Sequence, residues 1–176
     1  CLYRAEKFDP AAVYLAAAIP GLADAKLKAE AGLLLGRSHQ SAKRPAEAIA
    51  AFQAARAASP KWERTDELLY VLAATFKDDG KLDQAAAELT ILQKQFAKSE
   101  FLDRALYELG DIARAQQKPD PAVVLFQRVL AEFPEFEIKH VLEKPKLTPP
   151  NSGNSSSTRN RNSQHRKPAE TSSLGL

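Results

Sequence analysis

The side chains that carry out most acid–base, nucleophilic and metal chemistry are few and scattered in this chain of 176 residues. The three histidines are His39, His140 and His165, and no two of them have the spacing of metal ligands. Cys1 is the single cysteine, which excludes an internal disulfide and a cysteine metal cluster. Asp78-Asp79-Gly80 lacks the alternating oxygen ligands of a calcium loop and indicates a turn between helices. No phosphate-binding loop, nucleophile elbow or dinucleotide fingerprint occurs. We therefore predict no enzyme activity, no cofactor and no metal.

A repeat with a period of 37 residues organises most of the chain. A small residue recurs at Gly36, Ala73 and Gly110. An alanine follows twelve residues later in each unit, and a bulky residue follows four residues after that alanine, as in Ala48 and Phe52. Small residues let two helices approach closely, and residues four apart lie on one face of a helix. Each unit is therefore predicted to be a pair of packed helices, here called helix A and helix B in chain order.

This pattern resembles the tetratricopeptide repeat, a helix–turn–helix unit that stacks into arrays. In that family a small residue of helix A is followed by alanine after twelve residues, an aromatic residue after sixteen and proline after twenty-four. These spacings hold for Gly36, Ala48, Phe52 and Pro60, and again for Gly110, Ala122, Phe126 and Pro134. The middle unit departs from the pattern, with Leu89 at the aromatic position and Ala97 at the proline position. The resemblance covers about residues 4–135.

The resemblance implies an all-α fold, an open right-handed superhelix of antiparallel helix pairs with about three and a half repeats. The repeat domain is expected at 1–136, with a partial repeat at 1–20 and full repeats at about 24–60, 61–97 and 98–134. Helices are predicted near 10–18, 24–41, 45–58, 64–78, 82–97, 100–116 and 121–133. Asp9 and Asp120 each precede a proline and are expected to cap the helix that follows.

Residues 137–176 break the repeat. The next small residue of helix A falls due at position 147, inside a segment (144–150) whose three prolines are incompatible with a helix. The rest is rich in Ser, Asn and Arg, which predicts a disordered basic tail. Two alternatives stay open, a polybasic arm for phosphates or anionic lipid and a frame-shifted, artefactual sequence. The partial first unit indicates that the chain is a fragment.

The charge balance argues against a nucleic-acid partner. From Lys144 onward the chain has six basic residues and one acidic residue, within a formal net charge of +3. Residues 1–143 therefore carry a net charge of −2, and the basic character belongs to the tail. No run of about 18 apolar residues occurs, so no transmembrane segment is predicted. The expected partner is a protein or a peptide.

In tetratricopeptide proteins ligands usually lie against helix A, so the resemblance implies a partner-binding groove on that concave face. By register, we expect the groove to include Arg37, Gln40, Tyr70, Lys77, Tyr107, Asp111 and Arg114. Tyr70 and Tyr107 occupy the same site in successive units, where they either anchor a partner or pack between helices. The predicted function is a non-catalytic protein–protein interaction scaffold. The alternatives are a structural spacer of a larger protein and the repeat region of an enzyme whose catalytic domain is absent.

The three residues beyond the usual length of about 34 per repeat also carry information. Together with the segment 98–110, they resemble bacterial envelope tetratricopeptide proteins of the Tol-Pal accessory and outer-membrane assembly lipoprotein types. This resemblance favours the bacterial periplasm or cell envelope over the cytoplasm, and the compartment stays open. Cys1 is either a lipid-bearing cysteine or a truncation point.

Overall fold

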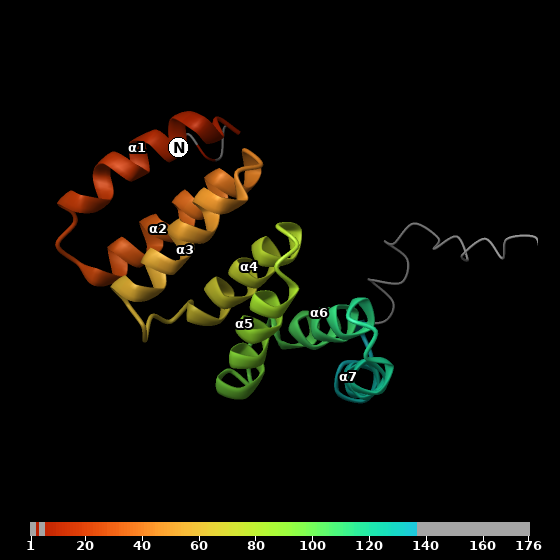
Figure 1. Cartoon of the computed structure of the whole chain (residues 1–176). Coiled ribbons are helices and arrows are strands. Elements are labelled where there is room, and N and C mark those ends of the chain that lie inside the picture. The colour runs from red at the N-terminus through yellow and green to blue at the C-terminus, as the bar shows by residue number, and fades with distance from the viewer. Residues whose placement is uncertain (1–2, 4–5, 137–176) are drawn as a thin grey trace, which may run out of the picture. The chain divides into compact units, whose positions relative to one another are not determined.

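The computed structural model describes Tyr3 and residues 6–136, which form seven α-helices and one short 3-10 turn (Figure 1). In chain order these are α1 (Phe8–Ala18), η2 (Ile19–Gly21), α2 (Ala25–Ser41), α3 (Pro45–Ala58), α4 (Thr65–Asp78), α5 (Leu82–Gln95), α6 (Leu102–Ala115) and α7 (Pro119–Glu132). The described part of the chain contains no strand. The predicted all-α helical repeat fold is confirmed. The predicted tail at 137–176 lies outside the described residues.

The helix boundaries agree with the predicted ones to within two residues, but both predicted caps are wrong. α1 begins at Phe8 and α7 begins at Pro119, so Asp9 and Asp120 lie inside the first helical turn. Pro119 takes the first position of α7, where the missing N–H of proline costs nothing. Inside the first turn the two aspartates still interact favourably with the positive end of the helix dipole.

A side-chain cap occurs instead at the start of α2. One carboxylate oxygen of Asp24 accepts hydrogen bonds from the backbone N–H groups of Lys26, at 2.6 Å, and Leu27, at 3.1 Å. These two N–H groups have no partner within the helix, so the carboxylate fixes where α2 begins.

The helices form pairs, and in two of the three pairs a glycine of helix A faces an aromatic ring of helix B. α2 packs on α3, α4 on α5 and α6 on α7 (Figure 1). At Gly110 an added Cβ atom would lie 2.5 Å from a ring carbon of Phe126, a distance that real Cβ contacts do not reach. At Gly36 an added Cβ atom would likewise overlap the ring of Phe52, which is fully buried. The spacing seen in the sequence is therefore a direct contact between helix A and helix B.

One apolar core runs through the successive pairs. It extends from Ala29 in α2 to Phe136 after α7, and Leu33, Leu72 and Leu106 are fully buried in it. Because each pair shares apolar contacts with the next, no pair forms a core by itself.

The glycine–ring contact predicts a large effect of one added methyl group. We expect Gly36→Ala to lower the free energy of unfolding by about 1–3 kcal/mol, because the methyl group overlaps the Phe52 ring. Urea denaturation followed by circular dichroism measures the change. Gly21→Ala is the control, since a Cβ atom there has no neighbour within 4 Å and should cause no loss. Equal losses in the two variants would contradict this packing.

Candidate functional site

Ion pairs between neighbouring A helices hold two of the predicted groove residues. The guanidinium of Arg37 on α2 pairs with the carboxylate of Glu67 on α4. The ammonium of Lys77 on α4 pairs with the carboxylate of Glu108 on α6. Each pair joins helix A of one repeat to helix A of the next. Arg37 and Lys77 therefore link repeats and are not unpaired cations lining a groove.

Glu67 is the more enclosed of these carboxylates. Its side chain is 12% exposed, and its second oxygen accepts a hydrogen bond from Nε of Arg64 at 2.7 Å. The hydrogen bond to Glu67 is the main cause that raises the pKa of Arg64. One carboxylate thus pairs with two guanidinium groups from different parts of the chain, at the contact between α2 and α4.

Both tyrosines of the predicted groove pack against aromatic rings. The Tyr70 ring stacks on Phe101, with centroids 5.4 Å apart and planes 22° from parallel. Burial raises the pKa of Tyr70 above its ordinary value, and the nearby carboxylate of Glu108 adds to the shift. The Tyr107 ring lies 5.6 Å from Phe126 and 5.4 Å from Phe136. Both tyrosines are half-buried, so part of each side chain packs and part stays accessible.

The last two predicted site residues lie together on α6. Arg114 donates a hydrogen bond from Nη2 to Oδ1 of Asp111 at 3.1 Å. The Arg114 side chain is 57% exposed, whereas that of Asp111 is 12% exposed. Of the three predicted cations, Arg114 is the most accessible to a partner.

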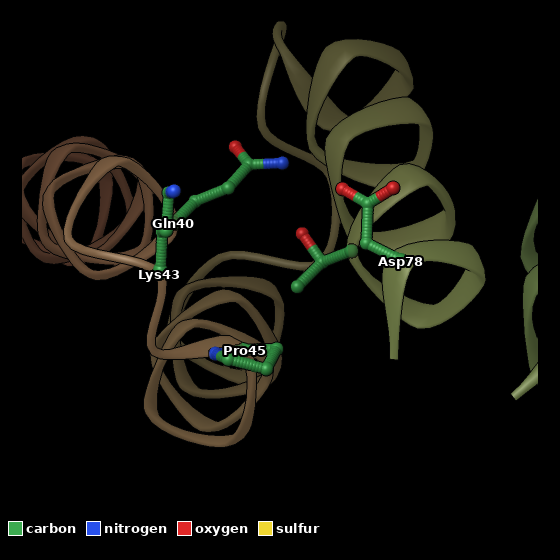
Figure 2. Close-up of a pocket in the computed structure, with 5 residues that line it drawn as sticks. Gln40, Lys43, Pro45 and Asp78 are labelled. Atoms are coloured by element: carbon green, nitrogen blue, oxygen red, sulfur yellow. The ribbon is translucent and has the colours of Figure 1, made fainter. Parts of the chain in front are cut away.

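A pocket of about 270 Å³ lies where α2 and α4 end (Figure 2). It is lined by Gln40, Lys43, Pro45, Thr75 and Asp78. Figure 2 shows the Gln40 side chain extending from α2 toward the carboxylate of Asp78 on α4. The buried Thr75 hydroxyl already donates a hydrogen bond to the backbone carbonyl of Val71 at 2.7 Å. The polar groups that the pocket offers are therefore an amide, an ammonium and a carboxylate.

Lys43 has a backbone conformation that favours glycine. Its φ is +58°, and its N–H donates to the carbonyl of Gln40 at 2.9 Å, in the turn that ends α2. The same left-handed conformation recurs one period later at Gly80 and again at Gln117. Glycine commonly ends helices in this way because other residues adopt this conformation at a cost. Lys43 was not among the predicted site residues, although its register with Gly80 could have revealed it.

Within the part of the chain that the structure describes, no group of three or more His, Cys, Asp or Glu side chains is arranged to hold a metal ion. His39 has a buried Nδ1 atom without a hydrogen-bond partner and takes the position that Phe76 holds one repeat later. This is a core position, and it indicates a packing role for the imidazole. Among the described helices none is long and apolar enough to span a membrane.

The tetratricopeptide repeat family model matches residues 30–61 and 104–135. The chain carries tetratricopeptide repeats. The two matched segments hold the glycine–ring contacts of Gly36 and Gly110. Tetratricopeptide repeats support a general role as a protein–protein interaction scaffold, and they are typically not catalytic. The resemblance to bacterial envelope proteins stays a prediction.

Among solved structures the chain is similar to one described as the crystal structure of MamA protein, with 26% sequence identity and a TM-score of 0.49. The similarity covers 69% of this chain and 61% of the MamA chain, so the chain spans less than two thirds of that protein's length. A comparison with curated proteins finds no match.

The enclosed carboxylate of Glu67 predicts a stability effect at the contact between repeats. We expect Glu67→Gln to lower the free energy of unfolding by about 1–2 kcal/mol, because Arg37 and Arg64 lose their shared counter-charge. Urea denaturation measures the change. Glu63→Gln is the control, since its ion pair with Lys26 is exposed and its loss should not be measurable. An unchanged midpoint for Glu67→Gln would show that the pair does not stabilise the contact.

The backbone of Lys43 predicts a stabilising substitution. We expect Lys43→Gly to raise the free energy of unfolding by about 1 kcal/mol, because glycine adopts positive φ without a steric cost. Gly80→Ala, at the equivalent turn, should lower it by about the same amount. The two variants are compared by urea denaturation, and a destabilised Lys43→Gly would refute the prediction.

Proposed function

We propose that this chain is a non-catalytic scaffold that binds an extended or helical segment of a partner protein along α2, α4 and α6. The pocket at the ends of α2 and α4 is the observation that supports the proposal most directly. The side chains of Gln40, Lys43 and Asp78 form no hydrogen bond or ion pair with one another or with other residues in the described ranges. They are therefore available to a ligand.

The chemistry of this pocket fits a peptide main chain. The Gln40 amide both donates and accepts hydrogen bonds, as a peptide group does. Lys43 adds a donor and Asp78 adds an acceptor on opposite sides of the same pocket. A segment that exposes backbone N–H and C=O groups, or a pair of opposite charges, satisfies all three side chains.

The remaining residues of the proposed site have different roles. Tyr70 and Tyr107 give a partner half-exposed rings one repeat apart, each held rigid by aromatic neighbours. Arg37 and Lys77 keep the repeats in register through their ion pairs. Asp111 and the exposed Arg114 supply charge beyond Tyr107 on α6, and Arg114 is suited to an acidic group of the partner.

The side chain of Lys43 favours a binding role over a structural spacer. A spacer gains only stability from the turn after α2, and glycine would supply more of it. The lysine at this turn places a charged side chain in the lining of the pocket, which a spacer would not use.

Selection from a displayed peptide library, followed by fluorescence anisotropy with the selected peptides, tests this function. We expect Gln40→Ala/Asp78→Ala to weaken binding at least tenfold, because the peptide loses hydrogen bonds in the pocket. The matched control is Gln53→Ala/Gln84→Ala, which removes exposed polar groups from α3 and α5. The double variant Tyr70→Ala/Tyr107→Ala tests whether the two rings contribute to binding. Circular dichroism confirms that this variant is folded.

Two results would refute the proposal. One is a failure to select any peptide, which favours the structural spacer. The other is a selected peptide whose affinity is the same for the pocket variant and the control variant, which places binding elsewhere on the chain.

A further inference from the structure

A cavity of about 640 Å³ lies among the first helices of the array, α1, η2, α2 and α3. α2 packs on both α1 and α3 (Figure 1), and all three helices contribute to the lining. None of the lining residues belongs to the groove proposed above. Sites for small molecules have volumes of about 300–1,000 Å³, so this cavity has the size of a ligand site.

The lining of this cavity is apolar apart from one side chain. Ala51, Ala54 and Ala58 of α3 line it together with Ile19 of η2. Of the lining residues in the described ranges, Lys28 alone is charged. Lys28 is half-buried, and its ammonium forms no hydrogen bond or ion pair with the described residues. The cavity therefore offers an apolar surface and a single unpaired positive charge.

The next repeat shows which side chains occupy the equivalent positions. One period after Ala54 is Ile91, which packs partly buried against the core. One period after Ala51 is Glu88, whose carboxylate accepts a hydrogen bond from Arg56 at 2.7 Å and so joins α5 to α3. The cavity thus lies where the first repeat lacks an apolar branch and a carboxylate that the second repeat carries.

The first contact between repeats also lacks the cation of that ion pair. Ile19 takes the position that Arg56 has one period later. Gly32 is required by close packing, since an added Cβ atom would lie 2.8 Å from the Cβ atom of Ala55. Ala54 is exposed, so the packing of α2 on α3 does not require a small residue there. The opening therefore depends in part on a side chain whose size the core does not restrict.

We propose that the cavity binds a small aliphatic carboxylate, with its hydrocarbon chain against the alanines of α3 and its carboxylate on Lys28. The chain supplies the apolar volume that Ile91 supplies in the next repeat, and the carboxylate supplies the group that Glu88 supplies there. An ammonium binds a carboxylate through a charge-assisted hydrogen bond, which is stronger than one between neutral groups.

A peptide main chain suits this cavity less well than a hydrocarbon chain. Each peptide group brings an N–H and a C=O that need hydrogen-bond partners when they are buried. Among the described lining side chains only Lys28 is polar, and its ammonium donates but does not accept. A hydrocarbon chain has no such groups, and a carboxylate needs only donors. The lining therefore favours an aliphatic anion over a segment of a partner protein.

Isothermal titration calorimetry of the full chain with hexanoate, heptanoate and octanoate tests the proposal. We expect each added CH₂ group to strengthen binding about fourfold, the effect of burying one such group. The n-octylammonium ion has the same chain as octanoate and the opposite charge. It should bind roughly tenfold more weakly than octanoate, because it places a second cation beside Lys28.

Variants of two lining residues test where the carboxylate binds. Ala54→Ile introduces the side chain found one period later and should weaken octanoate binding roughly tenfold by filling the cavity. Ala50→Ile is the matched control at an exposed position of α3 outside the lining, and should leave binding unchanged. Lys28→Gln should weaken binding about tenfold, whereas Lys28→Arg keeps the charge and should retain binding. Circular dichroism confirms that each variant is folded.

Three results would overturn the proposal. The first is octanoate that binds neither in the titration nor in ligand-observed NMR. The second is octylammonium that binds as tightly as octanoate, which removes the role of the Lys28 charge. The third is equal octanoate affinity for Ala54→Ile and Ala50→Ile, which places the bound chain outside this cavity.

Discussion

The close approach of helix A and helix B within each repeat is the constraint on which the rest of the structure depends. At Gly36 and Gly110 the space of a side chain is filled by an aromatic ring from the partner helix. The middle repeat has Ala73 and Leu89 at the equivalent positions, and both are nearly fully buried. One side gains a methyl group while the other loses ring atoms, so the total volume changes little, which packed cores tolerate. The constraint is therefore on the sum of two volumes and not on either residue alone.

With the geometry of each pair fixed, the helices of successive pairs meet in the same way, and charged side chains link them at that contact. Arg37 with Glu67, Lys77 with Glu108 and Arg56 with Glu88 all join residues 30–32 positions apart, which is nearly one period. Partly exposed ion pairs of this kind contribute modestly to stability. A charge out of register would leave a partly buried group without its partner, and that is costly. The pairs thus specify which helix packs on which, while the apolar core supplies most of the stability.

The sequence predicted the helices and their pairing well because those features rest on spacings within one repeat. Gly36 and Phe52 lie sixteen residues apart and meet through local helix geometry alone. The ion pair of Arg37 with Glu67 was not predictable in the same way. It depends on the rotation between successive repeats, which no spacing within one repeat encodes. The predictions of helix caps at Asp9 and Asp120 were wrong for a third reason. A proline fits equally well at several positions of the first turn, so an Asp-Pro pair does not fix the residue at which a helix begins.

One tyrosine connects the proposed groove with the last helix of the array. The surface along α2 and α4 offers an amide, an ammonium and a carboxylate, whereas the outer face of α7 offers valine and leucine. Repeat arrays transmit effects between neighbours because each repeat touches only the next. Tyr107 belongs to the proposed groove and packs on Phe126, whose ring in turn fills the space beside Gly110. A shift of α7 would therefore reach the groove through the contact between the Phe126 and Tyr107 rings. Gln40 and Asp78 lie on α2 and α4, and the ion pair of Lys77 with Glu108 joins α4 to α6, the helix that carries Tyr107.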